Sequence, residues 1–284
     1  IATVNAIKLA GAEPFFVDIS EKSLNLDEEL LEKIIKKDFF LNNKKELIYK
    51  KNRKKISTLL TVFSLGLPSN MKFLKSLCIK YNLNFVVDAA CAIGSKYMNL
   101  KLSRMGADFY ILSFNANKII TSGGGGALIS SKKTLYNMSK LLSSNAKKHP
   151  DKYEFDKIGY NYRMNNIQAA VGLAQIENLE FFLKKKKYVR NFYEKYLQKE
   201  INKKYLKKLP KLSKRESSNW LSGFIVNKGN KNIRNFLKKK NIQAELFWKP
   251  CHLQVPYKNS IRTSMKITEK LWKKILILPS STSI

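Results

Sequence analysis

A carboxylate and a lysine each follow an apolar run of this sequence. Asp88 closes the run Phe85-Val86-Val87, and Lys118 comes five residues after the run 109–113. A lysine amine forms an imine with an aldehyde, and a carboxylate keeps a pyridine nitrogen protonated so that the ring accepts electrons. If the two runs are neighbouring strands, this pair is what a pyridoxal phosphate site requires. Taken alone, Lys118 is one of 47 lysines, and a surface position would be the better interpretation.

A serine and a glycine cluster flank Lys118. Ser113 ends the apolar run, where its hydroxyl could donate to a phosphate oxygen or simply bond its own backbone. The four glycines 123–126 permit backbone conformations closed to other residues, which suits either close approach of a cofactor or a tight turn. Their spacing is not the GxGxxG fingerprint of dinucleotide-binding folds.

Composition limits the classes of function. The chain has 284 residues, 44% of them apolar, which suggests one large domain and a smaller one. The net charge of +33 would suit nucleic acid or an anionic membrane surface. However, only seven of the 54 basic residues are arginine, the residue that recognises phosphates and bases through its planar fork. We therefore expect solvated lysine faces, no nucleic-acid partner and no membrane partner.

Cysteine and histidine are sparse. The three cysteines form no CxxC pair, so free thiols in a reducing cytosol are expected, and with them a cytoplasmic location. Two histidines, His149 and His252, lack the spacing of a metal site, and no metal is expected.

Strand and helix patterns alternate along the first part of the chain, which favours an α/β fold with a mixed, mostly parallel sheet flanked by helices. Ligands of such sheets lie beyond the carboxyl ends of the strands, where Asp88 and Ser113 are expected. We predict strands at 14–18, 56–63, 85–88, 109–113 and 127–130, helices at 23–37 and 70–81, and a loop or insertion at 39–55.

The second part of the chain is predicted to be smaller and mixed. An apolar stripe predicts one long helix over 165–200, with Asn165 and Gln168 as a capping pair. A strand at 220–226 and a helix at 232–240 predict an α+β domain. The expected division is a large domain at 1–175 and a linking helix with the small C-terminal domain at 176–284.

With these residues in view, the chain resembles the DegT/DnrJ/EryC1/StrS sugar aminotransferases, pyridoxal phosphate enzymes of fold type I. Together the matching stretches are specific, and they follow the family order over almost the whole chain. They are Ala2–Ile7, Val87–Ala90, Ser113–Lys118, Gly159–Met164, Gln168–Glu177, Trp248–His252 and Leu278–Ser281.

The resemblance implies a role for several residues. Lys118 falls on the catalytic Schiff-base lysine, Asp88 on the partner of the pyridine nitrogen and Ser113 on a phosphate ligand. Asn161 falls on an asparagine that reaches the neighbouring subunit's cofactor, which implies a homodimer. Three further residues are assigned to substrate binding: Tyr162, Arg163 and His252. For His252, a hydrogen-bonded loop histidine is an equal alternative.

The chain also departs from the family pattern. Cys91 stands at a cofactor-contacting position where the family usually has Gln, His or Glu, and a thiol is a weak hydrogen-bond partner. Glu245 stands where an arginine is common. The family's opening phosphate turn and its last helix are not found, so the sequence is expected to be truncated at both ends.

The resemblance implies transfer of an amino group from an amino acid, by analogy glutamate, to a nucleotide-linked keto-deoxy-sugar for bacterial surface polysaccharide or lipopolysaccharide. The stretch Asn145–Pro150 resembles the subgroup that makes legionaminic-acid-type sugars. A related sugar dehydratase would carry histidine in place of Lys118. A catalytically impaired or regulatory relative is the remaining alternative.

Overall fold

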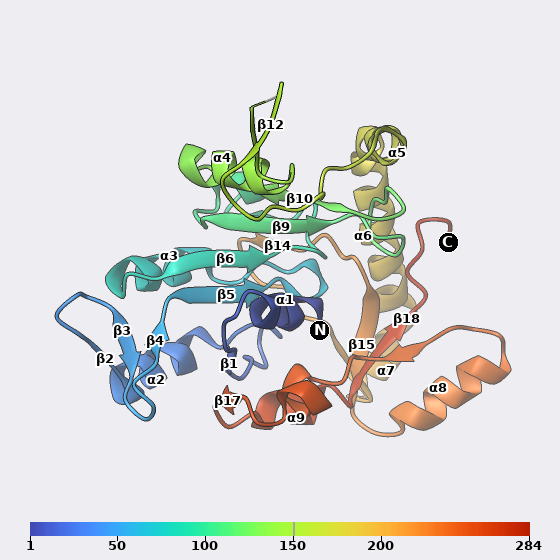
Figure 1. Ribbon diagram of the computed structural model, residues 1–284. Helices are drawn as coiled ribbons and strands as arrows, with labels where there is room; N and C mark the ends of the chain where they lie inside the picture. Colours follow the sequence, from blue (N-terminus) through green and yellow to red (C-terminus); the bar gives the residue numbers. More distant parts are fainter. Residues whose placement is uncertain (150) are drawn as a thin grey trace.

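A mixed four-stranded sheet organises the first part of the molecule (Figure 1). The computed structural model describes residues 1–149 and 151–284, so Pro150, the last residue of the stretch used for the subgroup resemblance, lies outside the described residues. The strand order is β10-β9-β6-β5; β5, β6 and β9 are parallel, and β10 is antiparallel to β9. Their bounds are β5 Thr58–Val62, β6 Asn84–Asp88, β9 Phe109–Ser113 and β10 Gly126–Ile129. The predicted mostly parallel sheet is confirmed.

Helices and loops bury this sheet. The four helices of this part are α1 Ala2–Leu9, α2 Glu28–Asp38, α3 Met71–Lys80 and α4 Lys133–Leu142. The N-terminal amides of α2 and α3 are capped by the side chains of Asp27 and Asn70. Residues of α2, α3 and the central strands form the largest apolar cluster, which includes the buried Leu74, Val87 and Tyr110. This packing fixes the carboxyl ends of β6 and β9 relative to each other.

Residues 39–55, expected as a loop or insertion, are not a loop. The segment folds into a three-stranded antiparallel sheet of β2 Phe39–Leu41, β3 Leu47–Tyr49 and β4 Lys55–Ile56, joined by turns. The rings of Phe39 and Tyr49 lie 4.9 Å apart between centroids, and Phe15 packs against both. Lysine and asparagine dominate the composition here, but they occupy the exposed turns while a few apolar residues carry the packing.

A second, antiparallel sheet forms the core of the C-terminal part, in the order β13-β15-β18-β16. Its strands are β13 Leu206–Lys208, β15 Ser222–Val226, β16 Glu245–Leu246 and β18 Ile275–Leu278, and its helices are α7 Gln198–Asn202, α8 Asn230–Lys239 and α9 Lys266–Leu271. These elements confirm the expected small α+β part. The boundary near residue 175 stays a prediction.

The prediction of a single helix over 165–200 is wrong in one respect. The segment forms two helices, α5 Asn166–Glu177 and α6 Leu179–Tyr196, which meet at Asn178. Asn165 caps α5 by accepting a hydrogen bond from the Gln168 amide. Asn178 leaves the helical conformation, with ψ of 9°, and ends α5.

Short pairings tie the two parts together. β1 Phe15–Phe16 pairs in parallel with β17 Ile261–Arg262. β14 Arg215–Glu216 pairs antiparallel with β7 Lys96–Tyr97. Asp18, 3% exposed, accepts hydrogen bonds from the amides of Ile267 and Thr268 at the start of α9. The remaining elements are β8 Leu100–Lys101, β11 Lys147–His149, β12 Lys152–Phe155 and the 3-10 turns Ser64–Gly66, Leu102–Arg104, Cys251–Leu253 and Val255–Tyr257.

Candidate active site

The sheet brings Asp88 and the segment before Lys118 to one edge. Asp88 is the last residue of β6, Ser113 is the last residue of β9, and the two strands are parallel neighbours with Asp88 paired to Ile111. Lys118 lies in the turn that follows β9, where its amide donates to the Asn115 carbonyl at 3.0 Å. Asp88 and Lys118, which the sequence predicts as a pair, therefore lie at the same carboxyl edge of the sheet.

Asp88 is held by two hydrogen bonds. The Thr3 hydroxyl, from α1, donates to Oδ2 at 2.6 Å, and the Ala90 amide donates to Oδ1 at 3.0 Å. These donors use one lone pair on each oxygen and orient the carboxylate.

The Lys118 amine lies between a thiol and an aromatic ring. Its Nζ is 3.5 Å from Cys91 Sγ and 4.0 Å from the centre of the Trp220 ring. Within residues 1–149 and 151–284 no carboxylate forms an ion pair with it. The side chain is half-buried. A lysine in this setting has no strong partner of its own and can take one from a ligand.

Cys91 remains a thiol at neutral pH. Burial raises its pKa to about 11, and Asp88 adds to the rise, while the neighbouring Lys118 ammonium acts in the opposite direction. The position at which the resemblance implies Gln, His or Glu thus carries a neutral, weakly bonding group.

The glycine cluster forms the tight turn between Lys118 and β10. Gly123 and Gly125 have φ of +77° and +78°, which other residues adopt only with strain. A Cβ on Gly126 would lie 2.3 Å from the Leu112 carbonyl oxygen, so close strand pairing requires glycine there. Ser113 Oγ accepts a 3.3 Å hydrogen bond from the Asn115 amide, the local bond that was the alternative to phosphate binding, and it keeps its own proton to donate.

Asn161, Tyr162 and Arg163 lie apart from this group in the chain. All three are exposed, in the segment between β12 and α5, and Asn161 bridges to Ser144. The Tyr162 ring stacks on Tyr160 at 4.8 Å and is 75% exposed. No hydrogen bond or ring contact among the described residues joins them to Asp88 or Lys118.

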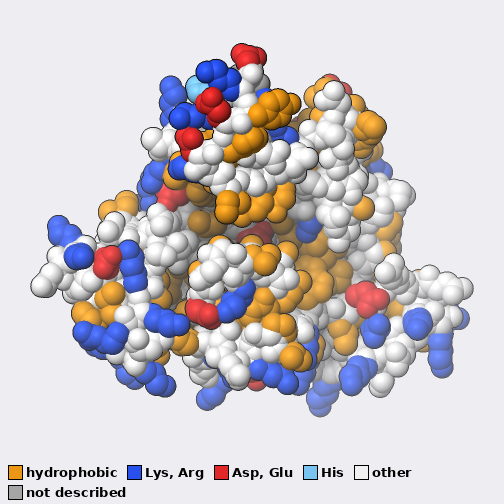
Figure 2. All heavy atoms as spheres, in the orientation of Figure 1, with side chains coloured by type: hydrophobic (Ala, Val, Ile, Leu, Met, Phe, Trp, Pro, Cys, Tyr) orange, Lys and Arg blue, Asp and Glu red, His pale blue; other side chains and the backbone are white. Residues whose placement is uncertain are grey.

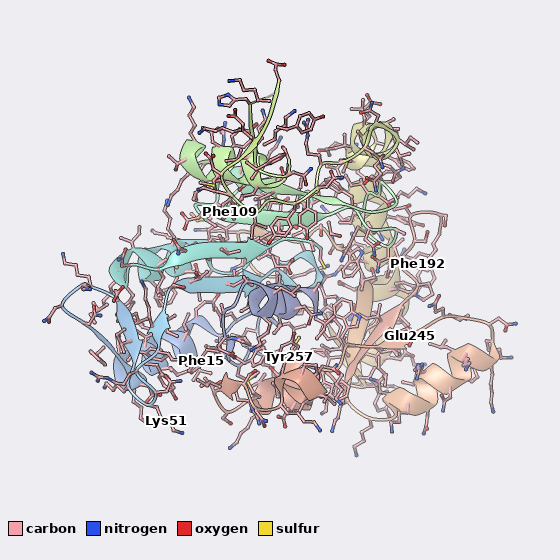
Figure 3. The ribbon with its side chains drawn as sticks, viewed as in Figure 1. Phe15, Lys51, Phe109, Phe192, Glu245 and Tyr257 are labelled. Carbon is pink, nitrogen blue, oxygen red and sulfur yellow. The ribbon has the colours of Figure 1, made fainter. Side chains whose placement is uncertain are left out.

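His252 and Glu245 have partners within the C-terminal part. His252 is 2% exposed, and its Nε2 lies 3.0 Å from Glu269 Oε1, which is the geometry of a hydrogen-bonded loop histidine. Glu245, labelled in Figure 3, forms an ion pair with Arg234 of α8 at 3.1 Å. Its charge is therefore partly balanced inside the same domain.

Sequence reasoning missed two contributors. Thr3 entered only as part of a resembling stretch, and Trp220 only as the first residue of a predicted strand. Both reach the site through contacts between distant parts of the chain, for which no local pattern exists.

Two other classes of site find no support in the described part of the chain. It holds no group of three or more His, Cys, Asp or Glu side chains placed for a metal ion. None of its helices combines the length and the apolar character needed to cross a bilayer.

The site fits pyridoxal phosphate. An amine without an acidic partner, a carboxylate fixed at the adjacent strand end and a glycine turn are present together. Lys118 would hold the aldehyde carbon, Asp88 the ring nitrogen and Ser113 the phosphate.

Comparison with known proteins agrees with this geometry. The model of the DegT/DnrJ/EryC1/StrS aminotransferase family matches residues 1–284. GDP-perosamine synthase of Escherichia coli O157:H7 is 31% identical over 287 residues, which cover 100% of this chain and 72% of that protein.

Solved structures give the same result. A DegT DnrJ EryC1 StrS aminotransferase from Brucella abortus superposes with a TM-score of 0.87 at 25% identity, covering 99% of this chain and 72% of that one. Helicobacter pylori PseC, an aminotransferase involved in the biosynthesis of pseudoaminic acid, has a TM-score of 0.85 at 28% identity and the same coverage. The chain therefore belongs to the DegT/DnrJ/EryC1/StrS aminotransferase family, whose fold it has and whose cofactor, pyridoxal phosphate, is its own.

Proposed function

We propose that this enzyme transfers an amino group from an amino acid, with glutamate as the donor, to a nucleotide-linked keto-deoxy-sugar. The observation that carries the proposal is the Lys118 amine, which lies at the same sheet edge as Asp88 and has no acidic partner among the described residues. The relatives in Escherichia coli and Helicobacter pylori bear the names of sugar-modifying enzymes, which supports a nucleotide-sugar substrate. A product used in bacterial surface polysaccharide, including a legionaminic-acid-type sugar, is part of the proposal.

The chain's own residues have distinct tasks. Bound pyridoxal phosphate supplies an electron sink for removal of a proton from the amino donor. Lys118 Nζ accepts and returns that proton as general base and acid. Asp88 holds a proton at the ring nitrogen, and Thr3 keeps the carboxylate oriented for this. Cys91 is a neutral thiol and adds no negative charge beside Asp88.

A homodimer is proposed as the working unit, because the candidate phosphate ligand Asn161 lies on an exposed surface. The helix α5 that follows has no buried residue and exposes Ile167 and Leu173 by 79% and 59%. An apolar surface of this kind indicates a protein interface. A second copy that covers it would bring its own Asn161 to the neighbouring site. Free thiols at the cysteines support a cytoplasmic location.

The decisive experiment replaces the amine. Purified chain and Lys118→Ala are loaded with pyridoxal phosphate and given glutamate with GDP- and UDP-linked 4-keto-6-deoxy-sugars, and 2-oxoglutarate is measured. In Lys118→Ala we expect the visible absorbance of the lysine-bound cofactor to disappear. The rate of 2-oxoglutarate formation should fall by at least about 10³-fold, because the proton-transferring group is lost.

Lys101→Ala is the matched control, because Lys101 is an exposed lysine on β8. It should keep both absorbance and rate. Survival of colour and transamination in Lys118→Ala would refute the proposed function.

A further inference from the structure

One short segment of the C-terminal part, residues 217–220, contacts both groups that flank the Lys118 amine. Ser218 Oγ donates to the Cys91 carbonyl at 2.8 Å. Two residues later, Trp220 places its ring 4.0 Å from Lys118 Nζ. Cys91 and Trp220, the two neighbours of the amine, are thus both contacted or supplied by a segment about 100 residues further along the chain.

Trp220 also holds the turn that carries Lys118. Its Nε1 donates a 2.7 Å hydrogen bond to the carbonyl of Asn117, the residue directly before Lys118. The side chains of the turn from Asn115 to Asn117 are exposed and supply little packing of their own. Trp220 is 2% exposed and packs in an apolar cluster with Ile119 and Ile120. The indole therefore fixes both the backbone before Lys118 and the space open to its side chain.

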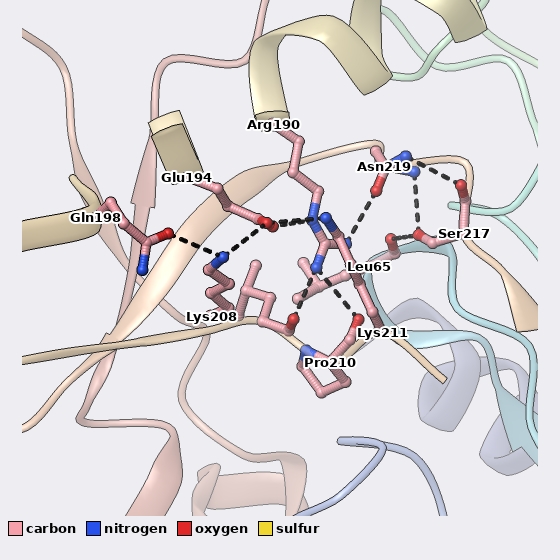
Figure 4. A network of polar contacts seen from close by, with 10 residues as sticks. Leu65, Arg190, Glu194, Gln198, Lys208, Pro210, Lys211, Ser217 and Asn219 are labelled. Carbon is pink, nitrogen blue, oxygen red and sulfur yellow. Dashed lines mark hydrogen bonds and ion pairs between the residues drawn. The ribbon is translucent and has the colours of Figure 1, made fainter. Parts of the chain in front are cut away.

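The segment is itself anchored by α6. Lys186, a buried lysine, donates to the Trp220 carbonyl at 3.0 Å and also to the Ser280 carbonyl. Arg190 donates to Asn219 Oδ1 at 2.9 Å, and Ser217 Oγ donates to the Leu65 carbonyl (Figure 4). Since α6 supplies charged donors on two successive turns, the position of Trp220 does not depend on apolar packing alone.

We propose that Trp220 is a positioning residue for Lys118, with Ser217–Trp220 acting as a clamp that aims the amine toward the cofactor. This rests on the proposed function of Lys118. A lysine side chain has four rotatable bonds and about 2 kcal/mol of rotamer entropy. The indole face excludes conformers that turn the amine away from the sheet edge, and attraction between ring and ammonium favours the remaining ones.

Two substitutions separate the contributions of the indole. Trp220→Phe keeps an aromatic face but loses the Nε1 hydrogen bond, and Trp220→Leu loses both. Pyridoxal phosphate is titrated into each protein, and binding is followed by visible absorbance. Borohydride then links the bound cofactor irreversibly to its lysine, and peptide mass spectrometry identifies that lysine. The apparent Kd should rise roughly 3- to 10-fold in Trp220→Phe and roughly 10- to 100-fold in Trp220→Leu. Cofactor fixed on the Lys118 peptide should fall in the same order, while other lysines gain it.

The matched control is Trp272→Phe, in the C-terminal part, which should bind within about twofold of the wild type. Melting temperatures identify any variant that fails to fold; if Trp220→Leu does so, Trp220→Phe decides. Unchanged Kd and unchanged Lys118 labelling in Trp220→Phe and in any folded Trp220→Leu would overturn the clamp while leaving the proposed function intact. Absence of Lys118 labelling in the wild type would instead overturn the proposed function, and the clamp with it.

Discussion

Two basic side chains of this molecule, the buried Arg190 and the half-buried Lys118, have partners of very different strength. Arg190 is 8% exposed and is saturated: Nε pairs with Glu194 at 2.8 Å, and Nη2 donates to the Leu209 carbonyl at 2.7 Å. Lys211 and Lys208 add further charge around Glu194 (Figure 4). Lys118, in contrast, has a thiol and a ring as neighbours. Arg190 is held by strong partners and stabilises the fold, whereas Lys118, the proposed Schiff-base lysine, has only weak partners that a ligand can replace.

The distribution of surface charge supports the same contrast. Figure 2 shows lysine and arginine side chains spread around the periphery of one face, while hydrophobic side chains gather in its middle. Spread charge of this kind is solvated and gives little stability to any one pair.

The largest effect is expected from breaking the saturated group. Arg190→Leu removes one of the two cations that lie 2.8 Å from the buried Glu194 carboxylate, and it leaves the Leu209 carbonyl without its donor. The free energy of unfolding should therefore fall by about 3–5 kcal/mol. Urea denaturation measures this. Lys118→Met is the comparison, and it should change stability by less than about 1 kcal/mol because only weak contacts are lost. An equal loss in the two variants would abolish the distinction between the two sites.

A pH series sharpens the same comparison. Burial acts to raise the pKa of Glu194, but hydrogen bonds from Lys211 and Arg190 outweigh it, and the pKa lies below its ordinary value of 4.5. A carboxyl with a lowered pKa stabilises the fold above the unfolded-state value, and that contribution is lost as pH falls through the folded-state value. The stability difference between wild type and Glu194→Gln should therefore be constant near neutral pH and shrink below pH 4.5. A difference that grows on acidification would contradict the assignment.

The smallest effect concerns the thiol beside Lys118. A pKa raised from 9.0 to about 11 means about 100-fold less thiolate at mildly alkaline pH. Alkylation of Cys91 by iodoacetamide, followed by peptide mass spectrometry, should be about 100-fold slower than alkylation of a cysteine in a short peptide. Lys118→Met should slow it further, because the ammonium lowers the pKa of the thiol. Faster alkylation in that variant would show that shielding, not charge, controls the thiol.

The central strands and the Asp88–Lys118 pair could be predicted because they depend on local pattern. Apolar runs mark β6 and β9, and the run 109–113 coincides with β9. Parallel pairing then places both ends at one edge, which is a general property of such sheets.

The remaining features depend on contacts that the sequence pattern does not report. Thr3 reaches Asp88 across 85 positions and Trp220 reaches Asn117 across 103. The sheet at 39–56 was missed because exposed lysines and asparagines separate its short apolar runs. The helix break at Asn178 was missed because it lies within a continuous apolar stripe. The hydrogen-bond partner of His252, Glu269, also belongs to a different element.

Asp18 and the start of α9 meet late in the life of the nascent chain. The Thr268 amide that donates to Asp18 lies 250 residues further along. At a translation rate of about 5–20 residues per second, roughly 12–50 s pass between the synthesis of Asp18 and that of the α9 amides that donate to it. Until then β1 has no β17 to pair with, so the nascent chain exposes an unpaired strand edge at β1. We expect a chaperone that binds apolar segments to bind the nascent chain there.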